Sequence, residues 1–207
     1  MTSTPISTTR VRAAFAAAAL LATVIVAVPA DAQVLCEGKV ATVVLETNEI
    51  AYQGGPGDDV IFGTNGPDVI FGNGGNDTIC GAGGDDRIRG GDGKDTINGG
   101  GGADFIWGDG GVDQLFGSDG KDVIRGGLGN DGIDGGRASD RILGGAGNDF
   151  IIGGPGNDRM FGGGKNDTIV GGSGPNDRLI GQGGTDSCTD PQTTTFTKEC
   201  EILNIGR

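Results

Sequence analysis

Histidine is absent from the 207 residues, and aromatic side chains are scarce, with eight Phe, one Trp and one Tyr. Without histidine the chain has no Ser-His-Asp triad and no HExxH zinc motif, and it also contains no GxSxG element. No glutamate occurs between Gly54 and Asp190, so no segment there can supply the bidentate glutamate of an EF-hand loop. These absences predict a protein that is not an enzyme, with a core that is not built from large side chains.

Basic residues are also in short supply, because 15 Lys and Arg oppose 28 Asp and Glu, for a formal net charge of −13. This acidity argues against a nucleic-acid partner and favours bound cations. Glycine is abundant, with 46 residues, and each glycine raises the conformational entropy that is lost on folding. We therefore expect something besides apolar burial to hold the chain together.

The first 32 residues differ from the rest in composition. They carry Arg10 and Arg12, then the apolar run AAFAAAALLATVIVAVP, and then the small-residue box ADA that ends at Ala32. A transmembrane anchor is the alternative, but the run is at the short limit for a bilayer span. The pattern predicts a secretory signal peptide over residues 1–32 and an extracellular mature protein that begins at Gln33 and has no membrane span.

Nine-residue units fill most of the remaining chain. Thirteen units follow one another without a slip from Gly54, a fourteenth from Gly171 has one extra residue, and a fifteenth covers residues 181–189. Position one is glycine in every unit, position four is glycine in thirteen, and position eight is apolar throughout. Position six is aspartate in all fifteen units, at Asp59, Asp68, Asp77, Asp86, Asp95, Asp104, Asp113, Asp122, Asp131, Asp140, Asp149, Asp158, Asp167, Asp177 and Asp186.

So strict a period predicts an all-β solenoid, in which each unit packs only on its neighbours. Positions seven to nine are expected to form a very short strand whose middle side chain points inward. Positions one to six are expected to form a turn whose glycines adopt backbone angles closed to other residues. Stacking such turns brings aspartates close together, and a hard cation between them would remove their repulsion.

The pattern G-G-x-G-x-D-x-U-x resembles the RTX, or hemolysin-type, calcium-binding nonapeptide repeat of secreted bacterial proteins over residues 54–189. The resemblance implies a right-handed parallel β-roll in which two units make one turn and Ca²⁺ lies between unit n and unit n+2. Fifteen units allow at most thirteen such sites. In the first site, the resemblance implies carbonyl ligands from Gly55, Gly57, Gly72 and Gly74 and carboxylate ligands from Asp59 and Asp77.

Three units depart from the family pattern. Lys165 puts a cation, and Ala138 a methyl group, where position four is otherwise glycine. An extra residue at Pro175–Asn176 is expected to distort the last turn on its edge. We expect these loops to bind calcium weakly or not at all.

Both ends of a solenoid need caps, because they expose apolar surface and open strand edges. We expect an N-terminal cap over residues 33–53, in which the stretch 39–52 alternates enough to pair as a strand, and a C-terminal cap over residues 190–207. Four cysteines in an exported chain, none spaced CxxC, favour disulfides over zinc. By position Cys36 would pair with Cys80 and Cys188 with Cys200, while the two other connectivities stay open.

When units are assigned alternately to two sheets, every arginine of the array falls on the units of one sheet, together with several aromatic rings. Such a face could bind an anionic cell-surface polymer, for example a polysaccharide. Alternatively, the long arginines cover apolar strand surface and offset nearby carboxylates. The residues are Arg87, Arg89, Arg125, Arg137, Arg141, Arg159 and Arg178, with Phe71, Phe105, Trp107 and Phe161.

Taken together, these features predict a secreted calcium-binding structural protein. The ion would drive folding, because binding energy becomes folding energy when the unfolded chain has no preformed site. The alternative function is a cell-surface adhesin or matrix module that uses the arginine-bearing face.

Overall fold

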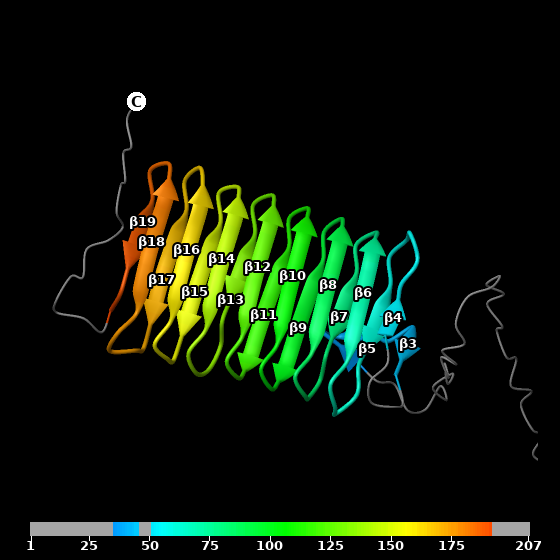
Figure 1. The fold of residues 1–207 in the computed structure, drawn as a ribbon. Helices are drawn as coiled ribbons and strands as arrows, with labels where there is room; N and C mark the ends of the chain where they lie inside the picture. The colour runs from blue at the N-terminus through cyan, green and yellow to red at the C-terminus, as the bar shows by residue number, and fades with distance from the viewer. Residues whose placement is uncertain (1–34, 46–50, 192–207) are drawn as a thin grey trace, which may run out of the picture.

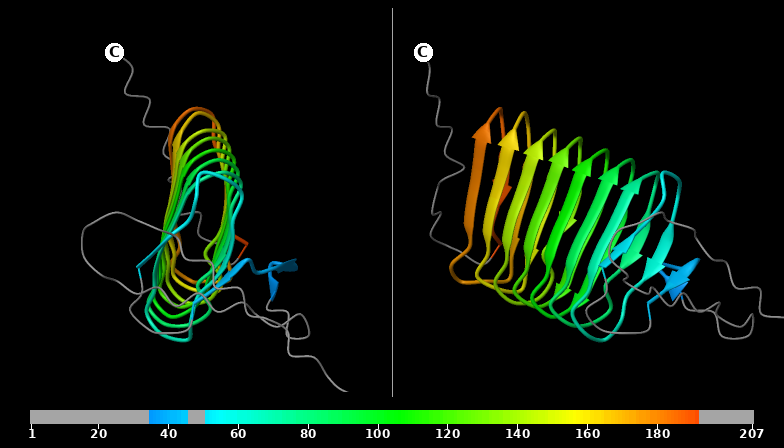
Figure 2. Two further views of the ribbon diagram at one scale, coloured as in Figure 1. Left: turned by 90° about the vertical axis from the view of Figure 1, so that its right-hand side faces the viewer. Right: turned by 45° about the vertical axis from the view of Figure 1, so that its right-hand side comes forward.

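The computed structural model describes residues 35–45 and 51–191, so the predicted signal peptide and most of the predicted C-terminal cap lie outside the described residues. The described residues contain strands and turns but no helix, and therefore no helix that could cross a membrane. Two parallel sheets face each other and form a flattened coil, with the turns along its two narrow edges (Figures 1 and 2). The predicted parallel β-roll is confirmed.

Successive units contribute strands alternately to the two sheets. The eight-stranded sheet contains β4 (Ala51–Gln53), β6 (Val69–Gly74), β8 (Arg87–Asp92), β10 (Phe105–Gly110), β12 (Val123–Leu128), β14 (Arg141–Ala146), β16 (Arg159–Gly164) and β18 (Arg178–Gly183). The nine-stranded sheet contains β3 (Val43–Val44), β5 (Val60–Phe62), β7 (Thr78–Cys80), β9 (Thr96–Gly101), β11 (Gln114–Asp119), β13 (Gly132–Asp134), β15 (Phe150–Gly154), β17 (Thr168–Gly172) and β19 (Ser187–Thr189).

Most strands are longer than the three residues predicted. From β8 onward they commonly run for six residues, from position seven of one unit to position three of the next. The reason is that the turns stack in the same register as the strands, so backbone hydrogen bonds continue into the glycine-rich segment. The Gly93 N–H, for example, donates to the Gly110 carbonyl at 2.8 Å.

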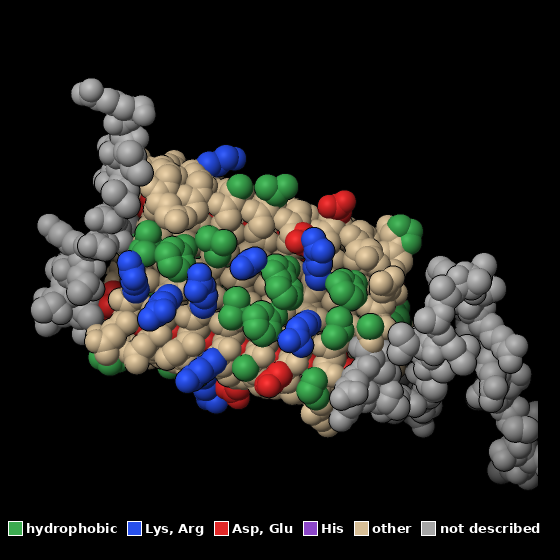
Figure 3. Space-filling model, viewed as in Figure 1, with side chains coloured by type: hydrophobic (Ala, Val, Ile, Leu, Met, Phe, Trp, Pro, Cys, Tyr) green, Lys and Arg blue, Asp and Glu red, His purple; other side chains and the backbone are tan. Residues whose placement is uncertain are grey.

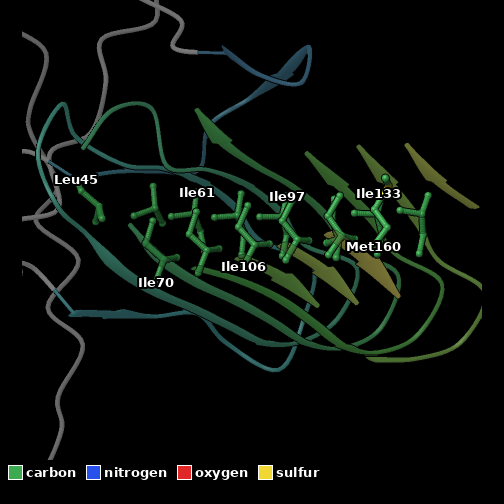
Figure 4. Packing of buried hydrophobic residues seen from close by; sticks show 14 of the residues in the cluster. Leu45, Ile61, Ile70, Ile97, Ile106, Ile133 and Met160 are labelled. Atoms are coloured by element: carbon green, nitrogen blue, oxygen red, sulfur yellow. The ribbon is translucent and has the colours of Figure 1, made fainter. Parts of the chain in front are cut away.

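The core is a double row of position-eight side chains between the two sheets (Figure 4). From Ile61 to Ile169 every member of this row is at most 2% exposed. The pairing register keeps identical positions in contact, since Ile106 lies between Ile88 and Ile124 on neighbouring strands. Only Leu179 and Cys188, in the last two units, are partly buried.

The N-terminal segment forms more than the single strand we predicted. Strands β3 and β4 each pair in parallel with the first repeat strand of their sheet, so the segment adds a short extra coil. Before them, β1 (Leu35–Cys36) and β2 (Lys39–Val40) form an antiparallel hairpin. A disulfide from Cys36 to Cys80 joins this hairpin to the third unit, and the Lys39 Nζ donates to the Thr78 hydroxyl at 2.7 Å.

The C-terminal pairing is described on one side only. Cys188 is disulfide-bonded, and its predicted partner Cys200 lies outside the described residues.

Arg137 does not share a sheet face with the other arginines, contrary to the assignment by alternate units. It is at position three of its unit, ahead of β14, where it forms a parallel bridge with Asp119 at the end of the nine-stranded sheet. Its guanidinium also contacts the Asp119 carboxylate at 3.2 Å. Position three of a unit therefore lies with the sheet of the preceding strand. Only positions seven to nine lie in the strand that the unit itself contributes.

Candidate metal centre

The position-six aspartates form a continuous ladder along each narrow edge of the roll. The backbone N–H of each aspartate donates to the Oδ1 of the aspartate two units later, as in Asp95 to Asp113 at 2.9 Å. Thirteen such bonds, all of 2.8 or 2.9 Å, join the fifteen aspartates from Asp59 to Asp186. The structure thus brings together the same thirteen pairs that the repeat predicted.

The second carboxylate oxygen of most ladder aspartates is buried without a hydrogen-bond partner. From Asp68 to Asp177 every ladder aspartate is at most 6% exposed. Thirteen of their oxygens have no partner among the described residues: Oδ1 of Asp68 and Oδ2 of Asp77, Asp86, Asp95, Asp104, Asp113, Asp122, Asp131, Asp140, Asp149, Asp158, Asp167 and Asp177. A buried polar oxygen without a partner is costly, and a carboxylate is the costliest case.

Position-one glycine keeps open the space into which these oxygens point. At Gly153, a Cβ atom would lie 2.6 Å from Oδ2 of Asp158 and 2.5 Å from the carbonyl oxygen of Gly171. The carboxylate of one unit and the carbonyl of the unit two places later therefore converge on one point. The position-one glycines do not have left-handed φ angles. The repeat predicts that the turn glycines are needed for their backbone angles. At position one, however, glycine is needed because no space is left for a side chain.

Burial raises the pKa of the ladder aspartates from Asp68 to Asp177 above the ordinary value of 3.8. Desolvation is the largest cause, opposed by the backbone N–H bond from the preceding coil and reinforced by neighbouring aspartates. The pKa reaches about 7 at Asp86, Asp113 and Asp140. It reaches about 6 at Asp77, Asp104, Asp122, Asp149 and Asp158. The folded roll thus favours either a proton or a cation at each carboxylate.

The first two units differ from those that follow. In them the position-two N–H bonds to the aspartate of the same unit, from Gly55 to Asp59 Oδ2 at 2.7 Å and from Thr64 to Asp68 Oδ2 at 2.6 Å. From Asn73 onward, position two has a left-handed φ, and the later Oδ2 atoms lack this bond. The first predicted site therefore has one carboxylate oxygen already engaged.

The structure also places the other members of that first predicted site. The Asp59 N–H donates to Asp77 Oδ1 at 2.8 Å, and the Gly72 carbonyl lies 2.5 Å from where a Cβ of Gly54 would be. The roles of Gly55, Gly57, Gly72 and Gly74 as carbonyl ligands stay predictions.

The three units expected to bind weakly keep the ladder intact. Ala138 and Lys165 adopt left-handed φ angles of 82° and 79°, the conformation that glycine adopts at position four in most other units. The extra residue of the fourteenth unit leaves the ladder continuous, because the Asp158 N–H still donates to Asp177 Oδ1 at 2.9 Å. The insertion is absorbed before position six. Weak calcium binding at these units stays a prediction.

A second ladder, which we did not predict, follows position five. Here the side-chain oxygen of unit n accepts the backbone N–H of unit n+2, from Asn148 to Asn130 at 2.8 Å and from Asn166 to Asn148 at 3.0 Å. Its direction is opposite to that of the aspartate ladder. The signal in the sequence was an Asn, Asp, Ser or Thr at position five of most units, the exceptions being Pro67, Lys94, Ala103, Val112 and Lys121.

The donor set suits a hard cation. Within the described residues no group of three His, Cys, Asp or Glu side chains gathers at one point. Each ladder step instead combines carboxylates with backbone carbonyls of glycine-rich turns, and calcium takes six to eight such oxygens. The uncompensated Oδ2 atoms and the space above position-one glycine fit an ion of this kind.

These features define a parallel β-roll whose two edges are lined by aspartates and glycine carbonyls. The model of the RTX calcium-binding nonapeptide repeat matches residues 53–88, 81–115, 107–142, 134–169 and 161–189. The chain therefore belongs to this family of calcium-binding repeat proteins. No curated protein matches the sequence.

Proposed function

We propose that this chain is a secreted, non-catalytic scaffold protein that folds when several Ca²⁺ ions bind between its stacked aspartate turns. The observation that carries the proposal is the series of thirteen buried carboxylate oxygens that lack a hydrogen-bond partner among the described residues. Without a cation these oxygens oppose folding, and with one they hold successive coils together. Outside a cell, where calcium is abundant, the protein would be folded.

Up to thirteen ions would be held by successive aspartates of each edge, with glycine carbonyls completing the shell. In a typical step, Oδ2 of Asp158 and the carbonyl of Gly171 would be ligands, since both border the space above Gly153. The first step on one edge, with Asp59, is expected to be the weakest there, because Gly55 already occupies its Oδ2.

The test is circular dichroism of the mature protein during a calcium titration, with magnesium as the control ion. We expect calcium to produce the β-sheet spectrum and magnesium to do so poorly, because Mg²⁺ demands strict octahedral geometry and gives up water reluctantly. If the protein has the same β-sheet content in excess EGTA at neutral pH as it has in calcium, the proposal is refuted.

A pair of variants tests whether calcium drives folding by binding at the aspartate ladder. Asp95→Asn keeps the shape of a buried ladder residue but removes its charge, whereas Asp92→Asn removes one charge from the exposed residue at the end of β8. We expect Asp95→Asn to raise the calcium concentration at half-folding several-fold and Asp92→Asn to leave it nearly unchanged, as measured by the same titration. Equal shifts for both variants would mean that general acidity, not the ladder, attracts calcium.

A second candidate function is attachment to an anionic polymer at the cell surface. One observation favours it: exposed arginines and aromatic rings share the outer surface of the eight-stranded sheet, and positions seven and nine of that sheet carry no acidic residue.

A further inference from the structure

We define the arginine face as the outward side chains at positions seven and nine of β8, β10, β12, β14, β16 and β18 in the eight-stranded sheet. In Figure 3, basic and hydrophobic side chains gather over this sheet. The members used here are Arg87, Arg89, Phe105, Trp107, Arg125, Arg141, Leu143, Arg159, Phe161 and Arg178.

Three arginines of this face stand in direct register on adjacent strands. Arg141 pairs with Arg159, and Arg159 pairs with Arg178, so the row places like charges on strands about 4.8 Å apart. Like charges directly across strands destabilise a sheet. In the described part of the chain, the only salt bridge on the arginine face joins Arg89 to Asp109. A chain rich in carboxylates therefore leaves this row without neutralisation.

Beside the row lies a shallow groove of about 220 Å³, lined by Arg125, Arg141, Leu143, Phe161 and Gln182 among others. The Arg141 guanidinium lies over the Phe161 ring, 5.9 Å from its centre. On β10 of the same sheet, the rings of Phe105 and Trp107 are stacked with their centres 6.0 Å apart. The groove thus offers guanidinium groups beside the ring of Phe161, and β10 adds two further rings to the same face.

We propose that the arginine face binds a linear acidic polysaccharide whose sugar units carry carboxylates, with the groove beside Phe161 as its central subsite. The inference rests on the second candidate function and names its ligand class. A pyranose ring has an apolar face that can stack on an aromatic ring and carboxylate oxygens that guanidinium groups bind in a bidentate manner. The length of one sugar unit is similar to the strand spacing, so successive carboxylates can follow the arginine row.

The spacing of the arginines favours this ligand over nucleic acid. DNA carries one negative charge per about 1.7 Å, which is far denser than a row of arginines on strands about 4.8 Å apart. A polymer with one carboxylate per sugar can match the few arginines available. The nine-stranded sheet has no basic residue at its outward strand positions, so binding is confined to one face.

The experiment measures binding of short oligogalacturonates to the calcium-loaded mature protein by calorimetry, because short oligomers stay in solution with calcium. Their methyl esters, of equal length but uncharged, serve as the ligand control. The triple variant Arg141→Gln, Arg159→Gln and Arg178→Gln removes the row. The triple variant Lys94→Gln, Lys121→Gln and Arg137→Gln removes three positive charges from exposed turn positions and is the matched control.

We expect the unaltered protein to bind the acid and not the ester, and the row variant to lose affinity by about tenfold or more. The control variant should stay close to the unaltered protein. Equal losses in both variants, or no binding of oligogalacturonate by folded protein, would overturn the proposal. Binding of anionic lipid vesicles or single-stranded DNA in place of the oligosaccharide would overturn it as well.

Stability separates a binding role from a covering role for the arginines. If they served to shield apolar strand surface, Arg159→Gln would lower the melting temperature. If the row is a binding site, that variant removes two like-charged contacts and should melt at the same or a higher temperature while losing affinity. Circular dichroism in calcium shows whether each protein is folded, so failure of calcium-driven folding is distinguishable from failure of polymer binding.

Discussion

At the scale of single residues, each ladder aspartate uses its two oxygens differently. Oδ1 accepts the N–H of the coil before it, as between Asp77 and Asp95, and thereby fixes the register of the turns. From Asp77 to Asp177, Oδ2 points into the space above position-one glycine and lacks a hydrogen-bond partner among the described residues. In Asp59 and Asp68, Oδ2 instead accepts a backbone N–H of the same unit. The register of the turns and the proposed ion binding therefore depend on the same side chain, and neither asparagine nor glutamate would serve both roles equally well.

Alanine substitution at position one tests the need for space. Gly153→Ala would place a methyl group within 2.6 Å of both a carboxylate and a backbone carbonyl oxygen. We expect a loss of about 2–4 kcal/mol in the free energy of unfolding, measured by urea denaturation in calcium.

The matched control for this substitution is Gly101→Ala, at position three. No atom lies within 4 Å of its Cβ position, and its φ is not left-handed, so its effect should be small. Equal effects at the two positions would show that glycine matters at position one only through chain entropy.

Lys165 is a second residue whose replacement should show a clear effect. It adopts a left-handed φ of 79°, which costs a lysine more than a glycine. Burial raises the pKa of Asp149, and the charge of Lys165 offsets a small part of that rise. Lys165→Gly should stabilise the calcium-loaded roll by about 1 kcal/mol and lower the calcium concentration at half-folding.

Lys121→Gly provides the comparison, because Lys121 is an exposed position-five residue without a left-handed φ. It should give no stabilisation. A destabilised Lys165→Gly protein would mean that the lysine side chain makes a compensating contact.

At the scale of elements, the strands, turns and N-terminal hairpin are held by different forces. The strands are fixed by the buried isoleucine rows, whereas the turns depend on the two side-chain ladders. The position-five ladder needs no cation and is continuous from Asn130 to Thr185 on one edge. It is interrupted around Lys94, Ala103, Val112 and Lys121, where the turns have fewer links that are independent of metal.

The disulfide should act locally. Cys36→Ser removes the covalent link between the hairpin and the third unit, which spans 44 residues of sequence. We expect a stability loss of about 2–4 kcal/mol, with hydrogen exchange accelerating in β1 to β5 and unchanged in β12 to β16. Faster exchange throughout the roll would show that the N-terminal coil nucleates the whole solenoid.

At the scale of the whole molecule, the roll is a stack whose stability depends on many carboxylates at once. Their pKa values of about 6 to 7 in the folded chain exceed the ordinary 3.8 of an unfolded chain. The folded, metal-free roll therefore binds more protons than the unfolded chain between about pH 4 and pH 7. Its stability falls as the pH rises through that window.

Metal-free and calcium-loaded protein should consequently respond to pH in opposite ways. In EGTA we expect β-sheet content to increase as the pH is lowered from 7 toward 5. With calcium, the same change should weaken ion binding, because protons compete for the ladder oxygens. Circular dichroism at each pH, with and without the ion, measures both trends, and parallel trends would contradict the carboxylate account.

The repeat allowed the roll and its aspartate pairs to be predicted because each unit obeys the same local rule. Val43, Val44 and the segment 51–53 lie outside the repeat, so their extra coil could not be read from its period. The role of position-one glycine was also hidden, because the crowding arises only where the aspartate of the same unit meets a carbonyl of the coil two units away. Arg137 was assigned to the wrong side because a turn residue shares the unit of one strand and the location of another.

The eighteen-residue register has a consequence for how such a chain can lengthen or shorten. Loss of a whole coil would leave every later residue on its original sheet. Loss of a single nonapeptide would keep the hydrophobic interior but transfer all later strands to the opposite surface, dividing the arginine row from the rings upstream of it. To keep the arginine row and the rings on one face, units must therefore be gained or lost in pairs. The hydrophobic interior alone would tolerate the loss of a single unit.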